Sequence, residues 1–283
     1  MVLFATPTMR LLNASTNVAI AAVFRLHIAF LLAGIAARIP EYVAFGFIMY
    51  ATYTLDRALE CKEDSINKSE LCGANRTIGL VACITAFFSG TVILFYDGIY
   101  LAPLLPFIIG YLYSKGLRVG SYKLKLKGSL GGKNIIVGLT WAGTIALIVS
   151  QWCSSIQTLS IIFFFFGVKL FINSCVNDFK DVQGDIAAGV KTLPAYLGEK
   201  LTKKVLLLTL AGMYCLITFA IFFSVIKNEW IILLFSLVIT IVFLVVYSPS
   251  FETSNSIFNR KMREIAIYWE SGVCLGLRAC VPV

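Results

Sequence analysis

The chain has 283 residues, of which 59% are hydrophobic and 14% are charged, and its mean hydropathy is +0.86. This composition excludes an ordinary soluble domain and indicates a protein built from membrane-spanning helices. The net charge of +9 does not indicate binding to nucleic acid, because the basic residues gather in a few loops between long apolar segments.

Apolar runs near the length of a membrane span recur along the chain and predict about nine spanning helices, with eight as the alternative. The ninth span is the weaker one, because Glu270 lies in its middle. Residues 1–15 are expected to form an interfacial helix or to be disordered. The predicted spans cover about residues 16–37, 43–55, 77–96, 99–114, 134–150, 159–177, 205–226, 230–247 and 264–281.

Lysines and arginines concentrate in every second loop of this arrangement. The basic loops are residues 57–76, 115–133, 180–204 and 260–263, whereas the opposite loops and the C-terminal tail carry only Arg38, Lys227 and Arg278. Positive charge marks the cytoplasmic side of a membrane protein. We therefore expect the ends of the second and sixth spans to face the cytoplasm. Arg25, inside the first span, is interpreted as a structural residue in preference to a ligand contact.

The second span ends in an acidic cluster. Asp56, Glu60 and Asp64 follow the apolar run 43–55 at positions i, i+4 and i+8, which places them on one face of a helix. Thirteen apolar residues are few for crossing the hydrocarbon core. We infer that the helix continues and that its acids face a polar cavity.

A second acidic cluster ends the sixth span. Asp178, Asp181 and Asp185 stand at i, i+3 and i+7, so a continuous helix would carry all three on one face. Taken alone, the cluster is also typical of a solvated helix end. Two such clusters, each at the exit of an apolar helix, favour a shared site. Oxygen ligands without cysteine or histidine suit a hard ion such as Mg²⁺, which also binds phosphates.

The motifs resemble those of the UbiA-type intramembrane prenyltransferases. That family carries N/D-x-x-x-D-x-x-x-D at its second span and D-x-x-D-x-x-x-D at its sixth. The likeness continues through Gly184-Asp185 and Gly189-Val190-Lys191-Thr192-Leu193-Pro194, and extends over about residues 17–250. It implies an all-α, polytopic transmembrane helical bundle of about nine spans around a central cavity that opens to the cytoplasm. Residues 1–283 would then form a single integral-membrane prenyltransferase domain.

The resemblance also implies roles for individual residues. Tyr111 and Lys115 match the family's Tyr-x-x-x-Lys element and, with Arg57, are the expected catalytic residues. Tyr53 or Tyr111 would face the allylic cation. The implied contacts to an isoprenyl diphosphate are Lys115, Arg118, Lys180 and Asn177. The implied ligands of Mg²⁺ are Asp56, Glu60, Asp64, Asp178, Asp181 and Asp185.

The function implied is Mg²⁺-dependent transfer of a prenyl group to a lipophilic acceptor in the membrane, such as an aromatic or quinone precursor. Transfer to a glycerol-phosphate lipid and cyclisation of the prenyl chain are alternatives within the family. The loop after Asp64 lacks the family's N-R-P-x-R-P pattern. The identity of the acceptor therefore cannot be transferred from other members of the family to this chain. An ion or metabolite transporter is the alternative of another class, but paired discontinuous helices are not evident in the sequence.

Overall fold

The structure is a computed structural model that describes residues 6–59, 71–114, 117–119, 122–124, 131–187, 189–247 and 257–281. Three residues of the expected site, Glu60, Asp64 and Lys115, lie outside these ranges. For Arg118 only the backbone is described.

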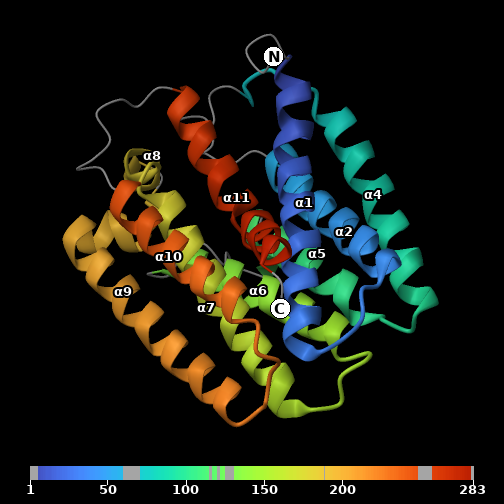
Figure 1. The fold of residues 1–283 in the computed structure, drawn as a ribbon. Helices are drawn as coiled ribbons and strands as arrows, with labels where there is room; N and C mark the ends of the chain where they lie inside the picture. Colours follow the sequence, from blue (N-terminus) through green and yellow to red (C-terminus); the bar gives the residue numbers. More distant parts are fainter. Residues whose placement is uncertain are drawn as a thin grey trace.

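Within the described ranges the chain folds into nine long helices and one short one (Figure 1). Each predicted span corresponds to one long helix, which confirms the all-α fold class. The long helices are α1 (Pro7–Ala33), α2 (Ile39–Ala58), α4 (Arg76–Tyr96), α5 (Leu101–Ser114), α6 (Gly132–Val149), α7 (Ile156–Asp178), α9 (Leu193–Phe222), α10 (Trp230–Val246) and α11 (Ile257–Cys280). The short one is α8 (Val182–Ala187).

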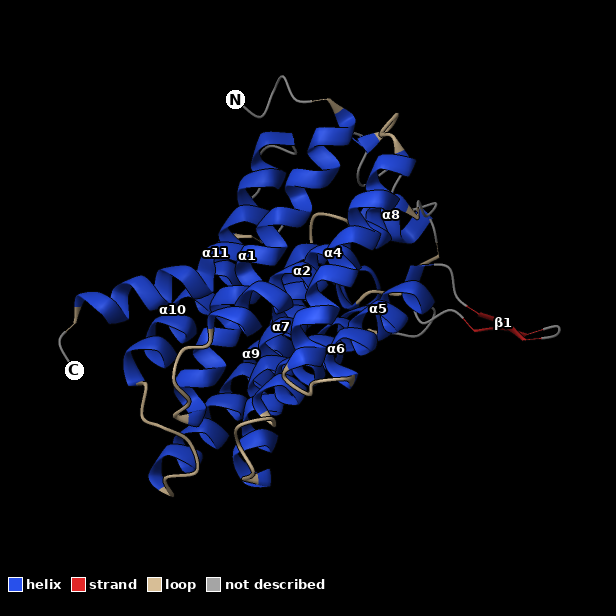
Figure 2. Cartoon of the chain, turned by 90° about the vertical axis from the view of Figure 1, so that its right-hand side faces the viewer, coloured by secondary structure: helices blue, strands red, loops and turns tan. Residues whose placement is uncertain are grey.

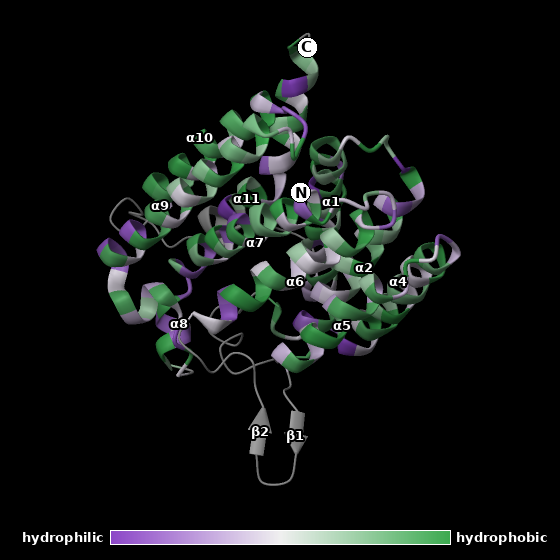
Figure 3. Cartoon of the chain, turned by 90° about the horizontal axis from the view of Figure 1, so that it is seen from below, coloured by the Kyte–Doolittle hydropathy of each residue, from purple (hydrophilic) through white to green (hydrophobic). Residues whose placement is uncertain are grey.

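Length and apolarity make five of these helices clear candidates to cross a membrane, namely α1, α4, α6, α7 and α9. Two more, α5 and α10, are apolar but shorter. The protein is therefore an integral membrane protein, and the count of nine crossings stays a prediction. Many large apolar side chains are exposed on the outside of the bundle, and green, hydrophobic residues cover most of the helices in Figure 3.

The first two helices are longer than their apolar runs. Helix α1 begins at Pro7, where the hydroxyl of Thr6 caps it by accepting from the Met9 amide. Residues 7–15 are therefore its first turns and not a separate segment. Helix α2 runs from Ile39 to Ala58, so Asp56 lies in its last turn. The helix thus continues three residues past the apolar run, as inferred, but it ends before Glu60. The expected common face with Glu60 and Asp64 lies outside the described residues.

A small antiparallel ribbon interrupts the basic loop between α5 and α6. Strand β1 (Leu117–Val119) pairs with β2 (Tyr122–Leu124), with Leu117 opposite Leu124. In Figure 2 the ribbon lies outside the helical bundle. The sequence indicated only a basic loop here, and the two strands were not expected.

Glycines bring two pairs of helices into close contact. A Cβ atom on Gly138 of α6 would lie 2.5 Å from the carbonyl oxygen of Gly167 on α7. A Cβ on Gly90 of α4 would lie 2.7 Å from the carbonyl oxygen of Ala44 on α2. Small residues at such contacts allow membrane helices to approach closely. The α6–α7 contact sets the start of α6 beside the end of α7, where the second acidic motif lies.

Candidate active site

The second acidic motif spans a helix end, a turn and a short helix. Helix α7 ends at Asp178, and α8 begins at Val182. The prediction that Asp178, Asp181 and Asp185 share one face of a continuous helix is therefore wrong. Backbone hydrogen bonds from Asp181 N to Asp178 O (3.0 Å) and from Asp185 N to Asp181 O (2.9 Å) still hold the segment in a tight, helix-like turn.

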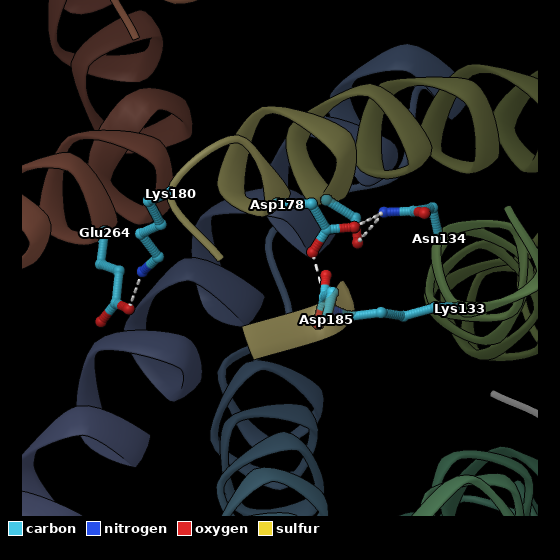
Figure 4. A network of polar contacts seen from close by, with 7 residues as sticks. Lys133, Asn134, Asp178, Lys180, Asp185 and Glu264 are labelled. Atoms are coloured by element: carbon cyan, nitrogen blue, oxygen red, sulfur yellow. Dashed lines mark hydrogen bonds and ion pairs between the residues drawn. The ribbon is translucent and has the colours of Figure 1, made fainter. Parts of the chain in front are cut away.

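Two residues at the start of α6 bind this motif. Lys133 Nζ lies 2.7 Å from Asp178 Oδ1 and 3.4 Å from Asp185 Oδ2. Asn134 Nδ2 donates to Asp178 Oδ2 at 2.6 Å. Both carboxylates are buried, and Figure 4 shows them converging on Lys133 and Asn134. Sequence reasoning missed both residues, because Lys133 was counted among the basic loop charges and Asn134 only as the start of a span.

The burial of Asp185 affects its protonation. Burial is the main cause that raises the pKa of the Asp185 carboxyl, Lys133 lowers it, and the charges of Asp178 and Asp181 raise it, so that the net pKa is about 6. The pKa of a carboxyl group rises when the group is buried and when other carboxylates lie close to it. A divalent cation brought close to these oxygens would reverse that effect.

A cavity lies beside this motif. Six of the residues expected in the site line it, and they come from both acidic motifs and their neighbours: Asp56, Arg57, Asn177, Asp178, Lys180 and Asp181. Asp56 accepts a hydrogen bond from Ser114 Oγ at 2.6 Å, which ties α2 to the end of α5. The cavity also has an aromatic and cationic lining that includes Arg25, Tyr53, Tyr113, Lys133, Trp141 and Tyr268.

Three expected site residues have surroundings that the sequence did not indicate. Tyr111 is 46% exposed and is not among the residues that line the cavity, whereas Tyr113 is. Lys180 forms an ion pair with Glu264 of α11. Arg57 donates to Ser15 Oγ at 3.0 Å, so part of its guanidinium fixes α1 against α2.

Arg25 and Trp141 form one wall of the cavity. The guanidinium carbon of Arg25 lies 4.6 Å from the centre of the Trp141 ring, close enough for a cation–π contact. Trp141 Nε1 donates to Tyr53 Oη at 2.9 Å. Arg25, which the sequence favoured as a structural residue, thus stands buried at the cavity wall.

The oxygen atoms around the motif are suitable for a hard metal ion. In the described part of the chain no three acidic, histidine or cysteine side chains already form a metal cluster. However, Asp185 Oδ1 and Asn177 Oδ1 are buried, and neither has a hydrogen-bond partner there. Buried oxygens without partners are costly, and carboxylate and amide oxygens are ligands that Mg²⁺ accepts. The residues present therefore fit such an ion.

Apolar helices around a cavity of carboxylates, cations and aromatic rings define an integral membrane protein with a charged internal site. The family model of the UbiA prenyltransferase family matches residues 14–262. The chain belongs to this family, and its class is that of a prenyltransferase. No curated protein sequence matches the chain significantly.

Solved structures share the fold at low sequence identity. A UbiA homologue from Archaeoglobus fulgidus bound to DMAPP and Mg²⁺ is 16% identical with a TM-score of 0.62, over 96% of this chain and 100% of that one. A UbiA homologue from Aeropyrum pernix K1 is 10% identical with a TM-score of 0.59, over 91% and 96%. A digeranylgeranylglyceryl phosphate synthase is 14% identical with a TM-score of 0.55, over 96% and 92%.

Proposed function

We propose that this protein transfers a prenyl group from an isoprenyl diphosphate to a lipophilic acceptor within the membrane, in a reaction that requires Mg²⁺. The observation that carries the proposal is that Asp56 of the first acidic motif and Asp178 and Asp181 of the second line one cavity together with cationic side chains. A diphosphate needs both a divalent cation and positive side chains, whereas the lipid-facing bundle suits an apolar chain. The proposed acceptor class is an aromatic or quinone precursor.

The proposed metal ligands are the motif carboxylates and Asn177. Asp178, Asp181 and Asp185 would hold one side of the site, and Asp56 would hold the other with Glu60 and Asp64 of its motif. A Mg²⁺ ion held by these residues would neutralise charge on the diphosphate and so make it a better leaving group.

Cationic side chains of the cavity are proposed to bind the diphosphate directly. Lys133 and Arg57 lie beside the carboxylates that would hold the metal. Lys115, Arg118 and Lys180 remain proposed contacts from the basic loops. Fixed positive charges stabilise the negative charge that develops on a leaving group.

The aromatic lining is proposed to stabilise the prenyl cation that remains. Tyr53, Tyr113 and Trp141 all line the cavity, and electron-rich ring faces attract cations. We assign to Tyr113 the place that the sequence motif suggested for Tyr111. The surrounding bundle would keep water away from the cation. We also propose that the site opens to the cytoplasm, which the distribution of basic residues among the loops supports. Residues 1–283 are proposed to form a single domain.

The purified full chain in detergent tests the proposal. Geranylgeranyl diphosphate should release diphosphate in the presence of Mg²⁺, and adding a lipid extract should yield a prenylated product that mass spectrometry identifies. Asp178→Ala and Asp56→Ala should each lower turnover by orders of magnitude in a folded protein. Unchanged turnover in both variants would exclude the shared site. A prenylated glycerol-phosphate lipid as product would instead identify that lipid as the acceptor. A cyclised hydrocarbon would show that the prenyl chain reacts without an acceptor.

A further inference from the structure

Helix α11 is long enough to cross a membrane but is not apolar enough to do so alone. Its 24 residues span about 36 Å at about 1.5 Å per residue, against about 30 Å of hydrocarbon. Among the described residues it is nevertheless not one of the helices whose composition suits a membrane span. Four charged side chains with described surroundings contribute to this, namely Arg263, Glu264, Glu270 and Arg278. Charges are costly in hydrocarbon, so α11 needs partners that hold it across the bilayer.

A buried ion pair satisfies the charge in the middle of α11. Lys169 of α7 contacts Glu270, and their side chains are 7% and 2% exposed. The Lys169 ammonium also donates to the carbonyl oxygen of Ser236 at 3.1 Å and to the hydroxyl of Thr240, both on α10. Glu270 further accepts from Asn173 Nδ2 at 3.2 Å and from Ser236 Oγ at 3.3 Å. These contacts of the carboxylate thus come from α7 and α10.

Two further ion pairs join the ends of α11 to the same two helices. Near its start, Glu264 pairs with Lys180, which lies just after α7 (Figure 4). Near its end, Arg278 donates two hydrogen bonds, of 2.5 and 2.8 Å, to the carboxylate of Glu229, which directly precedes α10. Ion pairs therefore connect α11 to its neighbours at both ends and in the middle.

The fourth charge of α11, Arg263, also contacts the surroundings of α10. Its guanidinium carbon lies 5.0 Å from the centre of the Tyr247 ring, directly after that helix. Helix α1 packs against α11 as well, and there the contacts include those of Phe24 with Trp269 and with the backbone at Gly272. The spacing of the four charges along α11 therefore matches one position beside α7 and α10.

Stability alone does not account for the central ion pair. Replacing a buried pair by apolar residues of similar size is often neutral or stabilising, and the best-attested use of such groups is to specify a partner and its register. A shift of α11 by one helical turn, about 5.4 Å, would carry Glu270 away from Lys169. Both charges would then lie unpaired within the bundle, which is costly. The pair thus favours one register of α11 over its neighbours.

We propose that α11 is a conditional membrane span, which crosses the bilayer only by docking against α7 and α10, and that its crossing depends on the pairing of Glu270 with Lys169. The inference goes beyond the proposed reaction and does not depend on it. It bears on the cavity, because Glu264, Ile267 and Tyr268 of α11 line that space. The wall of the cavity is therefore completed only when α11 has docked.

Glycosylation mapping of the full chain, translated in the presence of microsomes, measures whether α11 crosses. An acceptor site for glycosylation is added either within residues 248–256, before α11, or in a tail after Val283, and the chain without an added site gives the baseline. If α11 crosses, only one of the two added sites is modified, whichever way the chain is oriented. This is the result expected for the wild type. Modification of both sites, or of neither, in the wild type would overturn the proposal.

Variants assign the crossing to the ion pair. Lys169→Met should lower the share of chains in which α11 crosses several-fold, because Glu270 then lacks its counter-ion within the membrane. The exchange K169E/E270K should restore crossing by rebuilding the pair, and K169M/E270M should restore it by removing both charges. Lys203→Met, which breaks the pair with Glu199 on α9, is the matched control and should cross like the wild type.

Two results would contradict the proposal. The first is a Lys169→Met chain in which α11 crosses as completely as in the wild type, since the pair would then serve only the stability of the folded bundle. The second is a loss of crossing in Lys169→Met that neither double variant restores, since Glu270 would then not be the reason for the loss.

Discussion

Lys133 and Asp178 form a short ion pair across the contact between α6 and α7, with 2.7 Å between Nζ and Oδ1. The side chains are 17% and 3% exposed, so water screens the pair only weakly. The same ammonium lies 3.4 Å from Asp185 Oδ2. Lys133 thus balances the charge of two carboxylates that the proposed site assigns to metal binding.

Replacing Lys133 by Met should destabilise the protein and weaken donor binding. Removing one partner of a buried pair leaves an uncompensated charge, which costs on the order of 3–5 kcal/mol. The matched control is Lys203→Met, whose partner Glu199 lies one helical turn away in a more exposed pair and whose loss should cost about 0–1 kcal/mol. Thermal unfolding and the KM for the donor check both variants. Equal effects of the two substitutions would contradict the assignment.

The raised pKa of Asp185 predicts a pH dependence of metal binding. Because this carboxyl titrates at about pH 6 in the folded protein, protons should compete with Mg²⁺ below that pH and the affinity should rise through it. The folded state without metal binds the proton more tightly than the unfolded state, whose ordinary pKa is about 3.9. The stability from this group is therefore present below about pH 4 and is lost as the pH rises through about 6.

Titration calorimetry with Mg²⁺ between pH 5 and 8 measures this dependence, and Asp185→Asn provides the comparison. The variant should bind Mg²⁺ more weakly and should lack the rise near pH 6. If the wild type and the variant follow the same pH profile, another group controls the binding.

The contact between α6 and α7 should not tolerate a side chain at Gly138. A Cβ atom there would lie 2.5 Å from the carbonyl oxygen of Gly167, so Gly138→Val must push the helices apart and carry Lys133 away from Asp178. We expect a loss of several degrees in Tm and of most activity. Gly212→Val on α9, where a Cβ atom meets nothing within 4 Å, is the matched control and should be tolerated. A fully active Gly138→Val protein would show that the close approach is unnecessary.

The helices could be predicted from the sequence because each long apolar run must satisfy its backbone hydrogen bonds internally within a membrane. The runs ending near Tyr96 and Ser114 therefore gave helix ends that agree with α4 and α5. The prediction that failed was the common helical face of Asp178, Asp181 and Asp185. Their spacing places them on one face only if the helix is continuous, and the chain instead turns at residues 179–181 before α8.

Of the candidate site, the sequence predicted only the residues that belong to short motifs along the chain. The acidic motifs stand out because charge is rare in this chain, but the pairing of Lys133 with Asp178 depends on how α6 packs against α7. Lys169 and Glu270 did carry a signal, since each is a charge inside an apolar run. Glu270 was interpreted as weakening the ninth span, because its partner 101 positions earlier can be recognised only once α7 and α11 are packed.

The ion pair of Lys180 with Glu264 predicts opposite effects of its two members on donor binding. Both side chains line the cavity, and the Lys180 side chain is 5% exposed against 38% for Glu264. The carboxylate competes with a diphosphate for the same ammonium. Glu264→Gln should therefore lower the KM for the donor several-fold, whereas Lys180→Met should raise it, because the variant loses the charge that the donor would use.

Steady-state kinetics with varied geranylgeranyl diphosphate measure both constants, and Glu199→Gln, on the more exposed pair with Lys203, controls for the loss of one negative charge. The alternative is that the pair only clamps the end of α7 to α11. In that case both substitutions lower the thermal stability, because either one breaks the clamp, and they shift the KM in the same direction or leave it unchanged. A KM that falls in Glu264→Gln, rises in Lys180→Met and stays constant in Glu199→Gln is the pattern that only a contact between Lys180 and the diphosphate produces.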